Sequence, residues 1–263
     1  MDGTKYVLSA ERVHKYFGGV KALAGATVAV EKGKLTSLIG PNGSGKSTFF
    51  NVITGFLEFE KGDATVNFKT NDIANMEPSI IAKKGMVRTF QHTRNFPQMT
   101  VLENMLVSPQ KQAGESIIWA FLGKRLWTIQ EKYNVKKAMV ILDFLEIGHV
   151  IDHLAEELSG GQQKLLAIGR LLMTQPSLLL LDEPVAGVNP TLANKIFDRI
   201  IELKDKKGIE VFLIEHNMDV IMAFSDEIYV LAEGKVIAQG TPEEVQKNRQ
   251  VLAAYLGESP DQA

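Results

Sequence analysis

The chain has 263 residues, 45% of them hydrophobic, and a formal net charge of −2. This length suits one large domain, or one domain with an inserted subdomain, and the composition can supply a buried core. The small net charge argues against general nucleic-acid binding, which usually needs a basic surplus. Because the sequence contains no cysteine, it excludes a disulfide framework, a thiolate metal site and a cysteine nucleophile.

The sequence also bears on membrane association. The N-terminal residues lack the basic and apolar regions of a signal peptide. The longest purely apolar runs, such as 178–181, are far shorter than the ~20 residues that span a bilayer. We therefore expect a soluble chain whose membrane role, if it has one, comes through a partner.

The predicted elements alternate between strand and helix. Residues 6–39 alternate apolar and polar positions, which predicts a small antiparallel sheet leading into a buried strand at 35–39. Residues 92–175 are mostly helical in pattern and interrupt the α/β order, so they predict an inserted helical subdomain. Further strands are expected at 63–68, 177–181, 210–215, 227–231 and 235–239, and helices at 49–53, 78–84, 101–106, 136–145, 190–207 and from 241 onward.

The stretch Gly40–Thr48 fits G-x-x-x-x-G-K-[ST], a phosphate-binding loop, and has the strand before it and the helix after it that this motif requires. Its glycines permit closely spaced amides that point at phosphate oxygens, and the helix dipole adds to their field. We expect Lys46 to reach the β- and γ-phosphates and Ser47 to bind Mg²⁺. The expected nucleotide-binding residues here are Gly40, Asn42, Gly43, Ser44, Gly45, Lys46, Ser47 and Thr48.

Two acids follow the aliphatic run 177–181, which has the composition of a central parallel strand. Ligands bind at the C-terminal ends of such strands. We expect Asp182 to hold Mg²⁺ from outside its inner ligand sphere, and Glu183 to orient or deprotonate the water that attacks the γ-phosphate. His216 follows another predicted strand at the same edge. It could bind the γ-phosphate, although a single histidine is more often structural.

Three other features each allow two interpretations. Ser159 and Gln162 fit a capping box, and the same helix start could be a second phosphate site. Gln91 is either an ordinary polar residue or a ligand that completes the Mg²⁺ shell. Tyr16 or Phe17 could stack on a base, but a buried aromatic on an alternating strand is locally the better interpretation.

From about Leu8 to Gly257, the motifs described above and their order along the chain resemble those of the ATP-binding subunits of ABC transporters. The segment Leu158–Gln162 is similar to the signature that sets this family apart from other phosphate-loop proteins. The resemblance implies an α/β phosphate-loop NTPase core with a mostly parallel central sheet, an N-terminal antiparallel β subdomain and an inserted α-helical subdomain. It implies one ABC ATPase domain over 1–263, divided into a nucleotide-binding core at 6–91 and 176–240, a helical signature subdomain at 92–175 and C-terminal helices at 241–257.

The resemblance also implies roles for individual residues. Phe17 would stack on adenine, with Tyr16 as the alternative one position away. Gln91 would bind Mg²⁺ and couple to the membrane subunits, Glu183 would be the catalytic carboxylate, and His216 would contact the γ-phosphate. The residues that would meet the γ-phosphate held by a second chain are Ser159, Gly160, Gly161 and Gln162, and the loop 185–189 would contact that chain.

The implied cofactors are ATP and Mg²⁺. The implied partners are a second ATPase subunit, identical or a sister chain, in a head-to-tail sandwich; transmembrane permease subunits; and, indirectly, a substrate-binding protein. Nucleic acid is not expected. The expected location is the cytoplasmic face of the membrane, with no membrane span of its own.

A narrower resemblance is to the branched-chain amino acid importer ATPases. It is carried by 88–96, 99–104, the long insert 108–137, 186–190, 214–218 and Ala254–Gly257. Val188 stands where that group usually has Leu, and Asn217 where it often has Asp. The alternatives are a urea or amide importer, a lipopolysaccharide exporter, a soluble non-transport ABC ATPase and a small-molecule kinase. An apolar cluster at 117–127 either packs on its own domain or docks a membrane partner.

Overall fold

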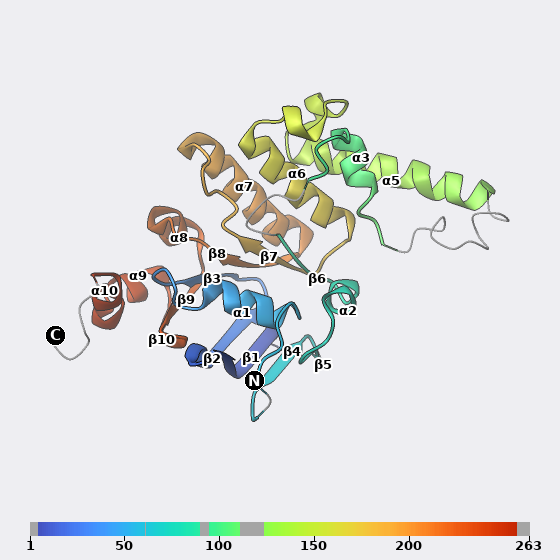
Figure 1. Ribbon diagram of the computed structural model, residues 1–263. Helices are drawn as coiled ribbons and strands as arrows, with labels where there is room; N and C mark the ends of the chain where they lie inside the picture. The colour runs from blue at the N-terminus through green and yellow to red at the C-terminus, as the bar shows by residue number, and fades with distance from the viewer. Residues whose placement is uncertain (1–4, 61, 90–94, 111–123, 257–263) are drawn as a thin grey trace. The chain divides into compact units, whose positions relative to one another are not determined.

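The structure is a computed structural model that describes residues 5–60, 62–89, 95–110 and 124–256 (Figure 1). The chain divides into two compact units. The first unit comprises Met1–Arg88, Ser177–Pro184 and Ile200–Ala263, and the second comprises Thr89–Pro176 and Val185–Arg199. In the described part of the chain, no helix is both long enough and apolar enough to cross a membrane.

The first unit contains two sheets. A six-stranded sheet has the order β10-β9-β3-β8-β7-β6, in which only the edge strand β10 runs antiparallel to its neighbour. Its strands are β3 (Leu35–Ile39), β6 (Met86–Arg88), β7 (Leu178–Asp182), β8 (Glu210–Ile214), β9 (Glu227–Ala232) and β10 (Lys235–Gly240). The prediction of a mostly parallel central sheet is confirmed.

The other sheet of the first unit is antiparallel and has the order β2-β1-β4-β5. Its strands are β1 (Tyr6–Phe17), β2 (Val20–Glu31), β4 (Thr65–Phe68) and β5 (Asn71–Asp72). The predicted N-terminal antiparallel sheet is therefore also confirmed. Strands β1 and β2 form its long hairpin, with a tight turn at Gly18-Gly19.

The register of the six-stranded sheet aligns three strand ends. Strand β8 lies between β3 and β7, and Ile214 pairs with Leu38 on one side and with Asp182 on the other. All three strands are parallel, so the residues that follow them emerge at one edge of the sheet. This edge is the one predicted to collect the phosphate loop, the two acids and His216.

Helices complete both units. Those of the first unit are α1 (Lys46–Ile53), α2 (Pro78–Lys83), α8 (Met218–Phe224), α9 (Pro242–Gln246) and α10 (Arg249–Leu256), and those of the second are α3 (Val101–Leu106), α5 (Lys124–Phe144) and α6 (Gly160–Met173). Helix α7 (Pro190–Lys207) begins in the second unit and ends in the first. In Figure 1, α8, α9 and α10 gather at the end of the sheet formed by β9 and β10.

Two predicted helix starts are confirmed as capping boxes. Ser159 caps α6 with Gln162, and Thr241 caps α9 with Glu244. One helix boundary was wrong, because α5 begins at Lys124 rather than at 136. The turns before 136 carry apolar residues at helical spacing, Leu126, Ile129 and Tyr133, so the earlier start was detectable and was missed.

The second unit has its own buried contacts. Gly169 of α6 lies so close to α3 and α5 that an added Cβ would meet Met105 at 3.0 Å and Leu145 at 3.1 Å. The fully buried Asn104 donates to the backbone oxygens of Phe96 and Met99, at 3.0 and 3.1 Å. Close helix packing and a satisfied buried amide therefore hold this unit together.

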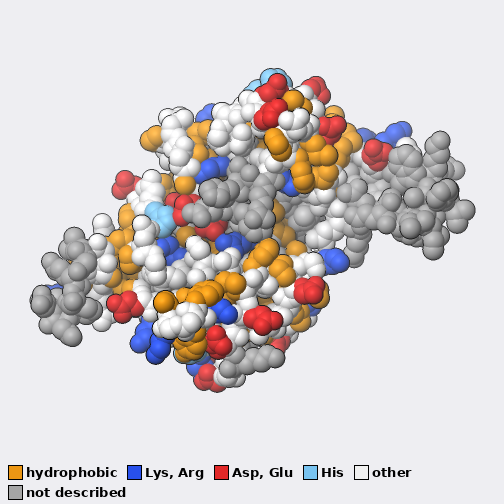
Figure 2. Space-filling view, in the orientation of Figure 1, with side chains coloured by type: hydrophobic (Ala, Val, Ile, Leu, Met, Phe, Trp, Pro, Cys, Tyr) orange, Lys and Arg blue, Asp and Glu red, His pale blue; other side chains and the backbone are white. Residues whose placement is uncertain are grey.

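The surface of the first unit carries both signs of charge. Figure 2 shows Lys and Arg side chains interspersed with Asp and Glu side chains over its visible described residues, with hydrophobic side chains between them. On that face, the described residues form no broad basic area. This distribution agrees with the formal net charge of −2.

Three phenylalanines join α1 to the central strand β8. The ring centroid of Phe212 lies 4.9 Å from that of Phe50 and 6.4 Å from that of Phe49, the latter in an edge-on arrangement. All three side chains are fully buried. Because α1 carries the C-terminal end of the phosphate loop, this aromatic packing fixes the loop to the sheet.

Truncating the central ring of this cluster should destabilise the protein strongly. We expect Phe212→Ala to lower the free energy of unfolding by about 3–5 kcal/mol, through lost burial and a residual cavity. The matched control is Phe56→Ala, whose side chain is 48% exposed and should cost about 1 kcal/mol or less. Urea unfolding of both variants measures the difference, and equal losses would contradict this account of the core.

Candidate nucleotide-binding site

The phosphate loop runs from the end of β3 to the start of α1, between two backbone segments that leave no room for a side chain. An added Cβ at Gly40 would lie 2.0 Å from the carbonyl oxygen of Leu231, and one at Gly45 would lie 2.4 Å from that of Ala22. Both glycines have positive φ, +149° and +106°. Glycine is therefore required at these two positions by space as well as by backbone angle.

The Lys46 side chain folds back over this loop. Its ammonium donates to the carbonyl oxygens of Gly40, at 2.7 Å, and Pro41, at 2.9 Å. Burial lowers the pKa of Lys46, while the charges of Glu183 and Asp182 act in the opposite direction. The two carboxylates therefore lie near enough to favour the charged form of the lysine.

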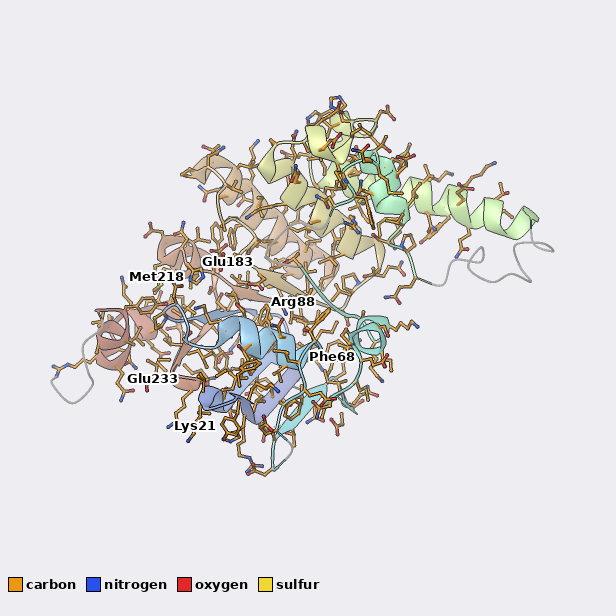
Figure 3. All side chains as sticks on the ribbon, viewed as in Figure 1. Lys21, Phe68, Arg88, Glu183, Met218 and Glu233 are labelled. Atoms are coloured by element: carbon orange, nitrogen blue, oxygen red, sulfur yellow. The ribbon has the colours of Figure 1, made fainter. Side chains whose placement is uncertain are left out.

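Asp182, the last residue of β7, is held by a buried ion pair. The guanidinium of Arg88, at the end of β6, lies 2.7 Å from its Oδ2 atom, and both side chains are almost fully buried. Arg88 also donates to the Asn51 side chain at 2.6 Å and stacks over Phe50. Arg88, labelled in Figure 3, thus links the ends of two neighbouring strands to α1.

Glu183 forms a close polar contact with His216. Its Oε1 atom lies 2.7 Å from Nε2 of His216, and the two side chains are 15% and 43% exposed. Glu183 has a φ of +50°, a left-handed conformation that is unfavourable for a residue with a side chain. Its amide nevertheless donates to the Ile214 carbonyl at 2.9 Å, which continues the β7–β8 pairing and holds this conformation.

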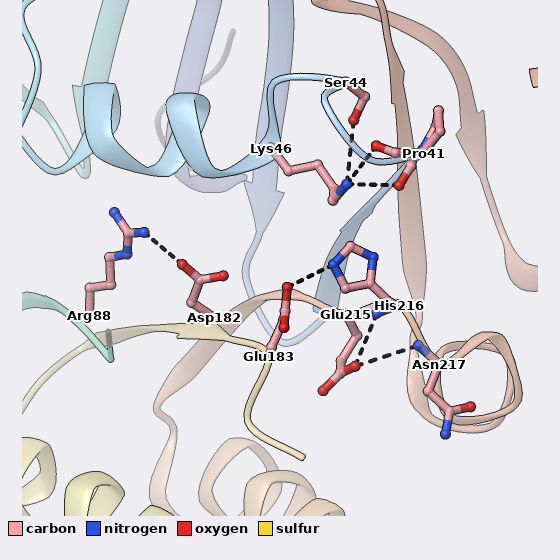
Figure 4. A network of polar contacts seen from close by, with 10 residues as sticks. Pro41, Ser44, Lys46, Arg88, Asp182, Glu183, Glu215, His216 and Asn217 are labelled. Carbon is pink, nitrogen blue, oxygen red and sulfur yellow. Dashed lines mark hydrogen bonds and ion pairs between the residues drawn. The ribbon is translucent and has the colours of Figure 1, made fainter. Parts of the chain in front are cut away.

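The residue between β8 and His216 also contributes. Glu215 is 3% exposed, and its carboxylate accepts the amide hydrogen of His216 at 3.0 Å and that of Asn217 at 3.5 Å. The backbone that carries His216 is therefore tied to a buried acid. In Figure 4 the Lys46 ammonium and the Glu183–His216 pair face the same space, with Asp182 beside them.

The two aromatic candidates lie at the end of β1, and the expectation of a buried core residue there was wrong. Tyr16 is 39% exposed and Phe17 is 47% exposed. The Tyr16 hydroxyl contacts Nδ1 of His14 at 3.2 Å, and the Lys15 ammonium lies over the Phe17 ring, 5.4 Å from its centroid. Both lie beside the turn at Gly18-Gly19, where the hairpin leaves the sheet core.

The signature segment lies in the second unit, at the start of α6. Ser159 and Gly160 are exposed, and the Ser159 amide donates to Oε1 of Gln162 at 3.0 Å. Gly161 is buried, and an added Cβ there would meet the Leu192 side chain at 2.1 Å. The segment is thus a capped helix N-terminus with its serine at the surface.

Several predictions lie where the structure gives no test. Gln91 and the insert residues 111–123 are outside the described residues, and so are the side chains of the 117–127 cluster. Sequence reasoning did not identify Arg88 or Glu215 as site residues. Arg88 contacts Asp182, which is distant in sequence, and Glu215 contacts the backbone of its neighbours. No motif spacing in the sequence predicts either contact.

Comparison with known proteins identifies the family. The model described as ABC transporter matches residues 23–186, and one described as branched-chain amino acid ATP-binding cassette transporter matches 235–261. A probable branched-chain amino acid transport ATP-binding protein, LivG, of Methanocaldococcus jannaschii is 46% identical over 262 residues, covering 98% of this chain and 100% of its own. The chain belongs to the ABC transporter family. It is an ATP-binding, ATP-hydrolysing cassette of that family.

Other relatives agree with this membership. The high-affinity branched-chain amino acid transport ATP-binding protein LivG of Escherichia coli K12 is 36% identical, covering 96% of this chain and 98% of its own. A nucleotide-free ATP-binding cassette from an ABC transporter superposes with a TM-score of 0.83 at 44% identity, covering 96% and 100% of the two chains. A cassette in its ADP conformation gives a TM-score of 0.82 at 43% identity, covering 96% and 99%. The predicted ABC fold is confirmed.

Two alanine substitutions in the loop distinguish the steric clash of an added Cβ from the cost of a positive φ. We expect Gly45→Ala to lower the free energy of unfolding by about 2–4 kcal/mol, because its Cβ meets the Ala22 carbonyl at a positive φ. At Gly43, also at positive φ, nothing lies within 4 Å of an added Cβ, so Gly43→Ala should lower it by only about 1–2 kcal/mol. Urea unfolding measures both, and a Gly45→Ala variant as stable as Gly43→Ala would contradict the packing described here.

Proposed function

We propose that this cassette powers an importer of branched-chain or other hydrophobic amino acids through separate permease subunits. The observation that carries the catalytic part is the Glu183–His216 pair facing the Lys46 ammonium at one edge of the sheet. The substrate class rests on relatives named for branched-chain amino acid transport, which match this chain along nearly its whole length.

In this proposal the triphosphate lies along Gly40–Thr48. The amides of the loop and of the first turn of α1 donate to phosphate oxygens, and the helix dipole favours the negative charge. The Lys46 ammonium exchanges the carbonyl oxygens of Gly40 and Pro41 for the β- and γ-phosphates. The base stacks on Phe17, the more exposed of the two aromatics.

The residues present suit Mg²⁺. Ser47 places an exposed hydroxyl in the first turn of α1, and Asp182 supplies a carboxylate whose orientation Arg88 fixes. Mg²⁺ prefers oxygen ligands of this kind and retains several waters. Gln91 is the further proposed ligand. When bound, the ion neutralises charge on the transferred phosphoryl group.

Glu183 is the proposed general base. Its carboxylate accepts a hydrogen bond from His216 when the histidine carries its proton on Nε2. A γ-phosphate gives the same N–H a new acceptor, so His216 moves to the phosphate and leaves Glu183 Oε1 to bind the attacking water. His216 thus couples the presence of a γ-phosphate to the release of the base.

A second chain completes the site in this proposal. The exposed N-terminus of α6, with Ser159, Gly160, Gly161 and Gln162, donates to the γ-phosphate held by the partner, and the loop 185–189 contacts that partner. The partner is an identical chain or a sister ATPase. Permease subunits bind near Gln91, which places the cassette on the cytoplasmic face of the membrane.

Neutralising the proposed base should abolish hydrolysis but not binding. We expect Glu183→Gln to lower kcat by about 10²- to 10⁴-fold, the usual contribution of a positioned base, with ATP affinity close to wild type. The control is Glu210→Gln, which removes a carboxylate at the opposite end of β8, where it accepts from the Gly33 amide. Phosphate-release kinetics measure kcat for both variants. A Glu183→Gln rate within tenfold of wild type would show that Glu183 is not the general base.

The substrate class needs a transport measurement. In cells whose only copy of this cassette carries Glu183→Gln, we expect uptake of labelled leucine, isoleucine and valine to fall to background, while the Glu210→Gln copy sustains uptake. Urea uptake, measured in parallel, should not change. Loss of urea uptake with normal leucine uptake would replace the proposed substrate by an amide.

A further inference from the structure

The guanidinium of Arg88 joins two elements that carry proposed ligands of the cation. One terminal nitrogen donates to Oδ2 of Asp182 at 2.7 Å (Figure 4). The other donates to Oδ1 of Asn51, in α1, at 2.6 Å. Because a guanidinium holds its nitrogens in one rigid plane, this single side chain fixes the end of β7 relative to α1.

Asn51 lies on the face of α1 that carries Ser47. The two residues are one helical turn apart, so their side chains are neighbours on the helix surface. Ser47 and Asp182 are the described residues that are proposed to hold Mg²⁺. Arg88 therefore connects the helix face that bears one of these ligands with the carboxylate that supplies the other.

The surroundings leave this connection little freedom to change. The Arg88 and Asp182 side chains are 6% and 3% exposed. The guanidinium carbon of Arg88 lies 5.3 Å from the centroid of the Phe50 ring, which is fully buried. Because protein interiors are close-packed, a shift of the guanidinium would also have to displace this ring. The separation between α1 and the end of β7 is therefore rigid.

We propose that Arg88 is a positioning residue that makes the cation site selective for Mg²⁺ over the larger Ca²⁺. Mg²⁺ requires short and nearly octahedral bonds to oxygen, whereas Ca²⁺ accepts longer bonds in a more variable geometry, so the rigidity of the ligands discriminates between the two ions. Arg88 keeps Ser47 and Asp182 from moving apart, which the larger ion would require. The proposal rests on the proposed roles of Ser47 and Asp182 in the nucleotide site.

The test compares nucleotide affinity in the presence of the two cations. The Kd of the full chain for a fluorescent non-hydrolysable ATP analogue is measured in EDTA, in excess Mg²⁺ and in excess Ca²⁺. Arg88→Lys keeps the positive charge beside Asp182 but loses the planar fork that also reaches Asn51, and Asn51→Ala removes the contact with α1 while keeping the ion pair. We expect the ratio of the Kd in Ca²⁺ to the Kd in Mg²⁺ to fall by about three- to tenfold in both variants, with the Kd in EDTA within about twofold of wild type.

Arg12→Lys is the matched control for the change from arginine to lysine. Arg12 pairs with Asp63 in the same unit, and their side chains are 56% and 66% exposed. The ratio of this variant should equal that of wild type. Each ratio is taken within one protein preparation, so a smaller folded fraction does not change it.

The outcomes distinguish this proposal from the proposed nucleotide site. An unchanged ratio in Arg88→Lys or in Asn51→Ala, an equal fall in Arg12→Lys, or a wild-type ratio near one would overturn the selectivity. A Kd in EDTA that rises as much as the Kd in Mg²⁺ would overturn it as well, because Arg88 would then support the loop in general. If Lys46→Ala binds the analogue in EDTA as wild type does, the nucleotide site itself fails, whatever Arg88 does.

Discussion

The pairing of β8 with β3 on one side and β7 on the other is the constraint on which the site depends. Ile214 is in register with both Leu38 and Asp182, so the segments that follow β3, β7 and β8 leave the sheet at the same level. A slip of one residue in either pairing would turn Glu183 or the phosphate loop away from the shared edge. The geometry of the candidate site is therefore set by strand register, which buried aliphatic side chains enforce.

Backbone contacts hold both the phosphate loop and Glu183 in place, and for Glu183 the conformation is costly. Gly40 and Gly45 lie against carbonyl oxygens of β9 and β2, and Glu183 keeps a positive φ through its amide bond to Ile214. Lys46 is buried against the carbonyls of its own loop. The strain at Glu183 persists because the surrounding sheet fixes its conformation.

Local chemistry explains what the sequence predicted well. The phosphate loop, the capping boxes and the strand ends bearing Asp182, Glu183 and His216 each depend on neighbours within a few residues. Contacts between distant segments were not predictable, such as the ion pair in which Arg88 reaches Asp182 across 94 positions. The exposure of Tyr16 and Phe17 was missed for a related reason, because alternation along β1 does not reveal where the hairpin leaves the core.

The central claim is that Glu183 completes hydrolysis at a site that requires a second chain. Size-exclusion chromatography of Glu183→Gln with and without Mg-ATP tests it most directly, because blocked hydrolysis should trap the closed pair. The account predicts a monomer without nucleotide and a dimer with Mg-ATP. A variant that stays monomeric in Mg-ATP, while wild type alone hydrolyses ATP at a rate independent of protein concentration, would contradict it.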